Sequence, residues 1–405
     1  MYLTEDYKAI KLQITRTVNL PDPVKVARFK KNPELGPKLL FFSGGTALRD
    51  LSKHLINYTW NSIHIITPFD SGGSSAELRK KFKMPAVGDI RNRLMALADQ
   101  SFQGNPDIYS LFAYRLPKDK NQHILMEELY SMAKGKHPMV VIIVDPMRKI
   151  IRNHLYLFLE KISETFDLRG ASIGNVILTA GYLSNRRLFD PVIFIFSKLV
   201  ECRGIVRPIV NKYRHLAAEL EDGTVLIGQH LLVGKESARI QSRVKKVFLT
   251  DETQKPLPVD VPIRKKMRSL ISQADLICYP MGSFYSSIIA NLLPKGVGDA
   301  VSQVDCPKVY IPNTCADPET HGMTLADQVK ILLIYLKKDN PKLIGNKRVL
   351  NYVLVDNQPG TYPGGIDKEG IKDLGVQIID YPIVTSRTSP QIDEQQLICL
   401  LLSLC

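Results

Sequence analysis

Residues 38–50 read KLLFFSGGTALRD, and this stretch decides the fold that we expect for the chain. Residues 39–42 form a short run of Leu and Phe, which is typical of a strand buried on both faces of a sheet. The small residues Ser43, Gly44, Gly45 and Thr46 follow, and then leucines recur at helical spacing. A strand, a glycine-rich turn and a helix in that order leave backbone N–H groups free at the positive helix end, where an anion can bind. The stretch therefore predicts a phosphate site.

The same turn also has a purely structural interpretation. It lacks the three spaced glycines of a dinucleotide-binding loop and the lysine of a Walker loop, so neither motif is assigned. A tight connection from strand to helix can need glycine for its backbone angles alone. Segments further along the chain favour the binding interpretation.

A second turn of the same kind follows the apolar run SIHIIT at residues 62–67, which we expect to be the next strand. The turn reads FDSGGSSAEL over residues 69–78, and Ser74 and Glu77 have the spacing of a helix capping box. The carboxyl ends of neighbouring parallel strands face one crevice at the edge of a sheet. We therefore place a second group of candidate phosphate-binding residues beside the first: Ser71, Gly72, Gly73, Ser74 and Ser75.

The remaining segments alternate between helix and strand signals. A helix is expected from Asp89, its candidate N-cap, to residue 98, and residues 109–134 are mostly helical in pattern. Residues 137–144 fit either a buried strand or the start of the helix that follows Pro146. Residues 205–251 predict short antiparallel strands around a turn at 221–223. Further helices are expected at 176–183, 263–273 and 324–336, and further strands at 275–279, 308–312, 351–356 and 376–379.

Together these segments predict an α/β fold, a Rossmann-like, mainly parallel sheet with helices on both faces and a small antiparallel insertion. We expect an N-terminal arm at residues 1–37, the first part of the α/β domain at 38–204, the insertion at 205–251, the second part at 252–382 and a C-terminal helix at 383–405.

Composition narrows the classes of function. The 405 residues carry a formal net charge of +14, which favours anionic ligands. Basic residues lie in several short runs and no nucleic-acid-binding motif is present, so a small anion is favoured over nucleic acid. The six cysteines show no metal-site or disulfide spacing, and no apolar run is long enough to cross a membrane. We expect a cytoplasmic protein with no membrane partner; the sequence allows a homo-oligomer without indicating one.

Six segments, taken in order, resemble the CofD/YvcK family, and the resemblance covers roughly residues 38–380. They are FSGGTALRDL (42–51), FDSGGSSAELR (69–79), VGDIRNRLMALAD (87–99), DLRGASIGNVILTA (167–180), ADLICYPMGSFYSSIIANLLPKGV (274–297) and PNTCADPETHGMTLADQV (312–329). Several of them are closer to the YvcK branch, whose gluconeogenesis-factor-like proteins bind a nucleotide sugar. The CofD branch contains 2-phospho-L-lactate transferases, which move a phospho-lactyl group from a guanosine diphosphate conjugate to the hydroxyl of a deazaflavin and release GMP.

The resemblance implies a nucleotide diphosphate conjugate or nucleotide sugar as the partner, bound in a crevice at the strand ends. It makes Asp70 and Asp89 the candidate catalytic residues, with Asp70 also a candidate ligand for Mg²⁺, the one cofactor implied. To the serines and glycines of the two turns it adds Asn92, Gly174, Asn175, Gly282, Ser283, Tyr285 and Asn313 as candidate ligand-binding residues. In the loop at 313–322, Glu319 is a candidate contact for ligand hydroxyls and His321 is either a general base or a solvated loop residue.

The sequence departs from the family pattern in three segments. The second acid of the family's Asp-Asp pair is Ser71, the glycine after Thr46 is Ala47, and the family's Gly-Pro-Gly-Ser is Pro280-Met281-Gly282-Ser283. The loss of a carboxylate at Ser71 puts both Mg²⁺ dependence and the transfer reaction in question. Three hypotheses therefore stay open: a nucleotide-sugar-binding metabolic regulator, a 2-phospho-L-lactate transferase-like enzyme, and a scaffold protein that has lost its ligand.

Overall fold

The computed structural model describes residues 17–101, 104–163, 165–233, 240, 242–358 and 362–405. Seven strands form a parallel sheet in the order β10-β9-β8-β7-β1-β2-β3. The strands are β1 (Leu39–Ser43), β2 (Ile63–Ile66), β3 (Ile205–Pro208), β7 (Leu276–Tyr279), β8 (Lys308–Tyr310), β9 (Tyr352–Val355) and β10 (Gln377–Asp380). The expected Rossmann-like α/β class is confirmed.

The central strand β1 is buried along its whole length, because layers of helices cover both of its faces. On one face, Leu40 and Phe42 pack into a core shared with β7 and the helices of the second half of the chain. On the other face, Leu39 and Phe41 pack with α2 (Arg49–Leu55) and α18 (Glu394–Ser403). The unbroken apolar run at residues 39–42 reflects this two-sided burial.

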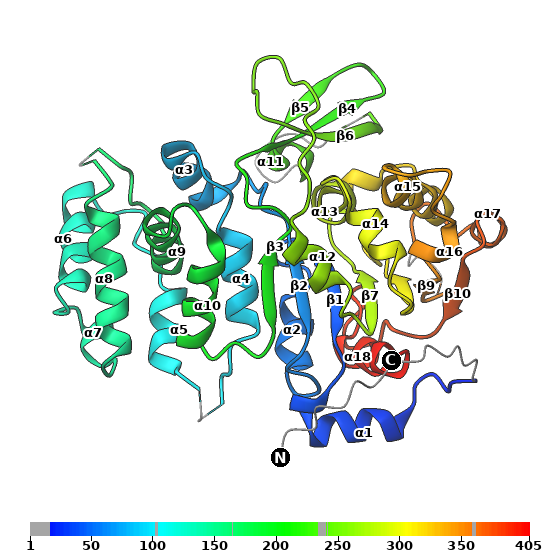
Figure 1. The fold of residues 1–405 in the computed structure, drawn as a ribbon, viewed down its shortest axis with the longest axis horizontal. Helices are drawn as coiled ribbons and strands as arrows, with labels where there is room; N and C mark the ends of the chain where they lie inside the picture. The colour runs from blue at the N-terminus through cyan, green and yellow to red at the C-terminus, as the bar shows by residue number, and fades with distance from the viewer. Residues whose placement is uncertain (1–16, 102–103, 164, 234–239, 241, 359–361) are drawn as a thin grey trace, which may run out of the picture.

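The helices of the second half cover one side of the sheet and lie at the right in Figure 1. They are α12 (Lys265–Ile271), the π-helix η2 (Phe284–Ile289), α13 (Ala290–Leu292), α14 (Val297–Ser302), α15 (Leu325–Lys337), α16 (Asn346–Val349) and α17 (Lys368–Asp373), with the short 3₁₀ turn η3 (Pro318–Thr320) before α15. Thr324 caps α15 in a capping box with Asp327, at the position where the helix over 324–336 was expected to begin.

The helices of the first half form a lobe with its own core beside β2 and β3 (Figure 1). They are α3 (Gly73–Phe82), α4 (Gly88–Ala96), α5 (Pro106–Ala113), α6 (Gln122–Ala133), α7 (Pro138–Val141), α8 (Met147–Leu159), α9 (Ile173–Ser184) and α10 (Phe189–Leu199). Residues 137–144 are neither a strand nor the start of the long helix, because they hold the separate short helix α7. The cis peptide bond between Asp145 and Pro146 lies between α7 and α8.

A small antiparallel sheet projects from the molecule at the top of Figure 1. It contains β4 (His215–Leu220), β5 (Val225–Ile227) and β6 (Val244–Thr250), and the short helix α11 (Gln229–Val233) packs against it. The insertion was expected to begin at residue 205, and this boundary is wrong. Residues 205–208 form β3, which pairs in parallel with β2 and completes the edge of the main sheet.

Two expected helix starts are also wrong. The N-cap of α3 is Gly72, so Ser74 does not cap that helix, and the side chain of Ser74 lies outside the described part of the structure. The N-cap of α4 is Val87, which places Asp89 inside the first turn. An acidic side chain in the first turn still favours the helix through its dipole.

Of the N-terminal arm, residues 17–37 are described. They hold α1 (Pro23–Lys31) and the 3₁₀ turn η1 (Pro33–Leu35), and α1 packs against the C-terminal helix α18. Lys25 joins the two by donating to the backbone oxygens of Ser403 and Cys405, each at 3.0 Å.

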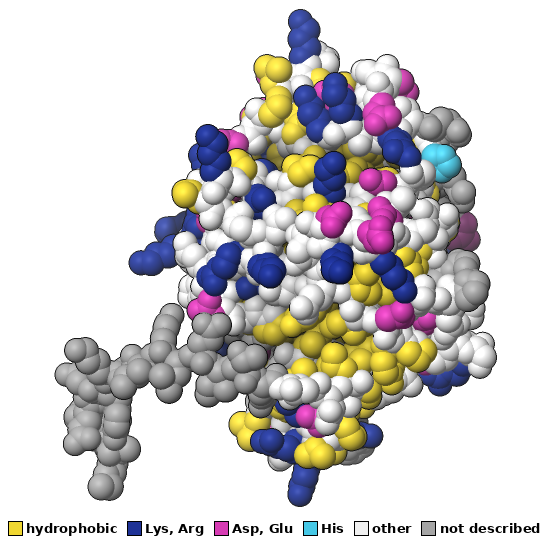
Figure 2. All heavy atoms as spheres, turned by 90° about the vertical axis from the view of Figure 1, so that its right-hand side faces the viewer, with side chains coloured by type: hydrophobic (Ala, Val, Ile, Leu, Met, Phe, Trp, Pro, Cys, Tyr) yellow, Lys and Arg dark blue, Asp and Glu magenta, His cyan; other side chains and the backbone are white. Residues whose placement is uncertain are grey.

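The surface in Figure 2 shows Lys and Arg side chains spread among acidic and hydrophobic ones rather than gathered into one basic stripe. This distribution on that face agrees with the preference for a small anionic ligand over nucleic acid. Among the described residues, none of the helices combines the length and the apolar character needed to traverse a bilayer.

Candidate functional site

The order of the strands sets the position of the candidate site. From β1 the chain proceeds outward through β2 to β3, and then returns to the other side of β1 and proceeds outward from β7 to β10. The strand order therefore reverses between β1 and β7. Ligands of open parallel sheets bind in the crevice outside the carboxyl ends of the strands at such a reversal. The loop that follows β1 is the first of the two glycine-containing turns predicted from the sequence, the loop after the neighbouring β2 is the second, and the loop after β7 contains Gly282 and Ser283 from the family resemblance.

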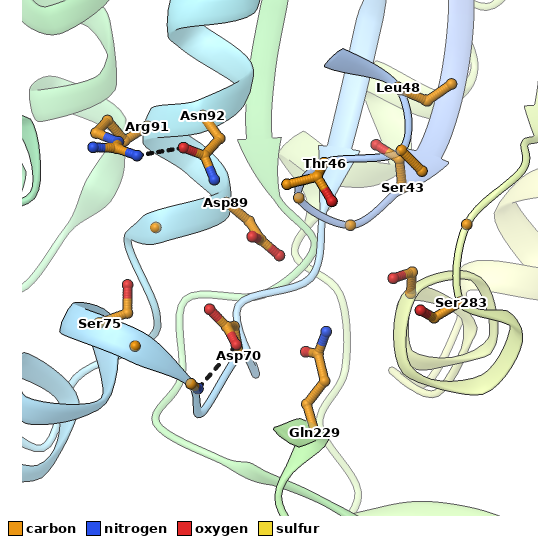
Figure 3. A pocket seen from close by; sticks show the side chains of 18 of the residues that line it. Ser43, Thr46, Leu48, Asp70, Ser75, Asp89, Arg91, Asn92, Gln229 and Ser283 are labelled. Atoms are coloured by element: carbon orange, nitrogen blue, oxygen red, sulfur yellow. Dashed lines mark hydrogen bonds between the residues drawn. The ribbon is translucent and has the colours of Figure 1, made fainter. Parts of the chain in front are cut away.

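A cavity of about 310 Å³ lies at this point. Most of the expected site residues line it: Ser43, Gly44, Gly45, Thr46, Asp70, Gly72, Gly73, Ser75, Asp89, Asn92, Asn175, Gly282 and Ser283. In Figure 3 the side chains of Asp70, Asp89 and Asn92 project toward the same space as Thr46 and Ser283, although they come from separate segments. The structure thus brings these parts of the sequence together.

The glycines of the first turn allow a close approach of neighbouring segments. A Cβ atom at Gly44 would overlap the hydroxyl of Ser287 in η2. A Cβ atom at Gly45 would lie 2.9 Å from Cγ of Asp89 and nearer still to its Oδ1. Side chains at either position would therefore push the walls of the cavity apart.

The backbone of this turn offers hydrogen-bond donors to the cavity. The N–H groups of Gly45, Thr46 and Ala47 have no hydrogen-bond partner among the described residues, and all three residues line the cavity. Ser43 is 3% exposed, and its hydroxyl also has no partner there. Buried polar groups are nearly always satisfied, so an unpaired hydroxyl on a cavity wall indicates a place for a ligand group.

Arg93 holds the turn in this conformation from behind. Its side chain is fully buried, and it donates to the carbonyl oxygens of Leu48 at 2.7 Å and Gly44 at 3.2 Å, and to the hydroxyl of Ser52. Burial lowers the pKa of Arg93 to about 10, which leaves it charged at neutral pH. Because the guanidinium occupies the carbonyl groups, it fixes the turn without using the N–H groups.

Two further arginines bring positive charge to the cavity wall. Arg91 and Arg115 both line it, opposite in charge to Asp70 and Asp89. Arg91 donates to Ser172 and to the side-chain oxygen of Asn92, and these bonds fix both side chains. Burial, followed by repulsion from Arg115, lowers the pKa of Arg91 to about 10. A diphosphate would relieve that repulsion.

The loop after β2 presents one carboxylate to the cavity. The Oδ1 atom of Asp70 accepts from the N–H of Gly72 at 3.0 Å (Figure 3), and Arg79 donates to the backbone oxygen of Asp70 at 2.5 Å. Ser71, in place of the family's second acid, does not line the cavity. Its hydroxyl pairs with Nδ1 of His230 in α11 at 2.7 Å.

The segment after β7 is held by a second set of side chains. Asn313 lies outside the cavity and brackets Gly282, accepting from its N–H at 2.9 Å and donating to its oxygen at 2.7 Å. Tyr285 is buried and does not line the cavity. Its hydroxyl donates to the backbone oxygen of Val244 at 3.4 Å. Gly174 is not among the residues that line the cavity. Its lack of a side chain allows α9 to pack closely against Arg91 and the backbone of Phe112.

Glu319 does not contact the cavity, which corrects its expected role toward ligand hydroxyls. It is 2% exposed and accepts hydrogen bonds from the N–H groups of Tyr285 and Ser286 at 2.7 and 2.9 Å. Asp317 accepts from the N–H of Phe284 at 2.9 Å. The first N–H groups of η2 are therefore occupied by two carboxylates, and they are not available to a ligand. His321 lines a separate cavity.

Several residues on the cavity wall were not expected from the sequence. They are Ala47, Leu48, Gly88, Arg91, Arg115, Gln229, His230, Met281 and Ser287. Arg91, Met281 and Ser287 lie in segments that resemble the family. Their position beside expected site residues could therefore have indicated them. Arg115, Gln229 and His230 belong to segments without any motif.

The described residues contain no group of three or more His, Cys, Asp or Glu side chains arranged to hold a metal ion. A metal at the cavity would therefore depend on ligand oxygens as well as on Asp70. Mg²⁺ commonly binds in this way, through one or two carboxylates together with substrate phosphates and water.

Comparison with known proteins agrees with the fold and the position of the site. A family model described as 2-phospho-L-lactate transferase CofD matches residues 39–384. The gluconeogenesis factor of Bacillus subtilis is 31% identical over 86% of this chain and 92% of its own. The gluconeogenesis factor of Listeria monocytogenes is 27% identical over 85% of this chain and 88% of its own. A crystal structure of a UPF0052 family member from Bacillus halodurans matches with a TM-score of 0.65 and 26% identity, over 91% of this chain and 99% of that chain.

Proposed function

Since this chain belongs to the CofD family, we propose that it binds a nucleotide diphosphate conjugate in the cavity between the carboxyl ends of β1 and β7. The observation that carries the proposal is the convergence of unpaired N–H groups at residues 45–47 with Arg91 and Arg115 around one cavity. A hydrogen bond to a charged group contributes about 1.5–3 kcal/mol, so three such N–H groups outweigh an exposed lysine, whose ion pair contributes about 0–1 kcal/mol.

We propose further that the protein acts as a nucleotide-sugar-binding metabolic regulator. The relatives named gluconeogenesis factor support a role in metabolism, and Ser71 supports binding without turnover. Its hydroxyl is paired with His230 and cannot replace a carboxylate as a metal ligand or base. The cavity then keeps the groups that hold a phosphate and lacks one of the two acids of the family pattern.

The second candidate is a 2-phospho-L-lactate transferase-like enzyme, and one observation favours it. Asp70 and Asp89 face the same cavity as the proposed phosphate-binding groups. Transfer of a phosphorus-containing group needs charge neutralisation on the diphosphate and alignment of the incoming hydroxyl. Arg91 and Arg115 would supply the first, and Asp70 the second.

Magnesium fits this cavity only as an ion shared with the ligand. Asp70 would provide a carboxylate oxygen, and the diphosphate would provide the others. Bound there, Mg²⁺ would neutralise charge that develops on the phosphates. A protein that binds the conjugate equally well with and without Mg²⁺ uses Arg91 and Arg115 instead.

Two measurements separate the candidates. Titration calorimetry of the pure protein with uridine and guanosine diphosphate conjugates, with and without MgCl₂, measures binding. Chromatography of the same mixtures, with a deazaflavin alcohol as acceptor, measures release of the nucleoside monophosphate. Tight binding without release supports the regulator. Steady release that disappears in Asp70→Asn supports the transferase.

The exposed Asp107, in the first turn of α5 and outside the cavity, provides the matched control. Asp107→Asn removes the same charge and should leave binding and release unchanged. If no conjugate binds and none changes the thermal stability, the proposed function fails and the scaffold hypothesis remains.

A further inference from the structure

A second cavity, of about 470 Å³, lies at the opposite edge of β3 from β2 and shares no residue with the candidate site. We call it the β3 cleft. Its walls come from the start of α10, from β3 and the segment after it, and from α12, which flank β3 in Figure 1. The lining residues are Leu188, Phe189, Asp190, Ile205, Arg207, Pro208, Ile209, Val210, Asn211, Lys212, Pro262, Arg264, Lys266, Met267, Ser269, Leu270 and Gln273.

The cleft exists because helices cover this edge of the sheet only in part. β3 pairs with β2 on one side alone, and its side chains alternate between half-buried and buried. Ile205 and Arg207 are the half-buried ones, on the face that carries α12. α12 has only seven residues, and it buries Met267 while Leu270 stays half-buried. An apolar strip of sheet and helix is left open.

Positive charge surrounds this apolar strip. Arg207, Lys212, Arg264 and Lys266 line the cleft, and Asp190 is its only acidic residue. Asp190 is shared, since it pairs with Arg207 at 3.2 Å and with Lys266 at 2.9 Å. Lys212 and Arg264 have no side-chain partner among the described residues. The cleft therefore carries a charge of its own that an anion would neutralise.

We propose that the β3 cleft binds a small amphipathic anion, with its apolar body against Ile205 and Leu270 and its anionic head group beside Lys212 and Arg264. The volume lies within the range of small-molecule sites, and the combination of an apolar lining with a few convergent polar groups is typical of them. An added peptide strand fits less well. β3 is only four residues long, and Pro208 at its end cannot donate a backbone hydrogen bond.

Decanoate and decyl phosphate, both below their micellar concentrations, are suitable probes of the full-length protein by titration calorimetry. We expect one equivalent of either anion to bind. Decan-1-ol, with the same apolar body and no charge, should bind about tenfold more weakly or less, because it makes no charge-assisted contact. Comparison of the two anions distinguishes a carboxylate head group from a phosphate.

Variants at exposed positions test the site without disturbing the core. Lys212→Glu with Arg264→Glu should weaken decanoate binding by about tenfold or more. Lys255→Glu with Lys265→Glu makes the same change of net charge at exposed residues outside the cleft, and should have little effect. Ser269→Trp should block the cleft from its rim while leaving nucleotide-conjugate binding unchanged.

Three results would overturn the proposal: equal binding of decanoate and decan-1-ol, equal loss in the two double variants, or unchanged binding in Ser269→Trp. A second copy of the chain is the other possible occupant of the cleft, and sedimentation of the same variants tests it. If the charge reversal at residues 212 and 264 dissociates a dimer and no anion binds, the cleft is an interface between copies of the chain and the proposal fails.

Discussion

Single residues from distant segments determine the shape of the turn after β1. Ser287 packs against Gly44, and the carboxylate of Asp89 packs against Gly45, so each glycine marks a contact between the turn and a different wall of the cavity. The sequence could show that glycines were needed here. It could not show which side chains needed the space, because Asp89 and Ser287 lie far away along the chain.

Gly45→Ala is expected to weaken binding of a nucleotide diphosphate conjugate by at least about tenfold, because the methyl group displaces Asp89 into the cavity. The loss of stability should be about 1–3 kcal/mol, as in other overpacked sites. Calorimetric titration and urea unfolding measure the two effects.

Gly345→Ala is the matched control, since a Cβ there has no neighbour within 4 Å. Adding Asp89→Ala to Gly45→Ala removes the group that the methyl would strike, and stability should recover. An unchanged affinity in Gly45→Ala would mean that the ligand does not approach this turn.

Arg93 shows how a buried charge can serve the site without touching a ligand. Its guanidinium satisfies two backbone oxygens of the turn and one hydroxyl in α2. The three acceptors are arranged around the planar guanidinium group, and the single ammonium of a lysine would not match that arrangement. This role could not be predicted from the sequence, because Arg93 belongs to a helix with other basic residues and its burial depends on the tertiary fold.

Arg93→Met should lower the free energy of unfolding by about 2–4 kcal/mol, since it removes charge-assisted bonds to Leu48 and Ser52 and leaves the oxygen of Gly44 without its donor. Arg93→Lys should lower the free energy of unfolding less than Arg93→Met does. It should lower it more than Arg169→Met, which removes only an exposed ion pair with Asp167. Urea unfolding of the three variants gives the order. A loss in Arg93→Met no larger than that in Arg169→Met would contradict the clamping role.

At the scale of elements, η2 begins against two carboxyl groups that the protein itself supplies. Asp317 and Glu319 occupy the N–H groups of Phe284, Tyr285 and Ser286, and Asn313 holds the turn at Gly282. The wall of the cavity formed by Ser283 and Ser287 is thereby fixed before a ligand binds. Burial, followed by the neighbouring Asp317, raises the pKa of Glu319 to about 8.

This raised pKa makes stability depend on pH in a definite direction. The folded protein holds the proton of Glu319 more tightly than the unfolded chain does. The contribution of Glu319 to the free energy of unfolding is therefore greatest below its ordinary pKa of 4.5. The contribution falls as the pH rises toward 8. The free energy of unfolding should therefore decrease over this interval.

Glu319→Gln should remove that decrease, because glutamine resembles the protonated acid and does not titrate. At pH 5 the variant should lie within about 1 kcal/mol of the natural protein, and the two curves should diverge in slope toward pH 8. Urea unfolding at several pH values measures both. The exposed Glu369→Gln is the control, and an unchanged slope in Glu319→Gln would rule out this titration.

The element-scale predictions succeeded where a local pattern alone decides structure. The strand at 39–42 and the helix expected at 324–336 follow from neighbouring residues. They failed where tertiary pairing decides. Residues 205–208 alternate in burial as an antiparallel strand would, yet they lie at the edge of the parallel sheet because β2 is their partner.

For the whole molecule, the strand order explains why two glycine turns so far apart in the sequence meet. β1 and β7 are neighbours, and each is followed by a turn that lines the cavity. Repeated strand, turn and helix patterns predicted that the turn after β1 shares a crevice with the turn after β2, and the family resemblance added Gly282 and Ser283 of the turn after β7. They could not predict Arg115 or Gln229, which reach the cavity through the helical lobe and the small antiparallel sheet and carry no motif of their own.

A ligand that occupies this cavity should stabilise both halves of the sheet together. At about 100 times its dissociation constant, a conjugate should add about 2.7 kcal/mol to the free energy of unfolding. Hydrogen exchange measured by mass spectrometry should then show slower exchange in residues 44–48, 88–92 and 281–287, while α6 and α8 on the far side of the lobe change little. Gly45→Ala at the same ligand concentration should show much weaker protection. Protection confined to one half of the sheet would mean that the ligand does not bridge β1 and β7, and that the two turns are neighbours by folding alone.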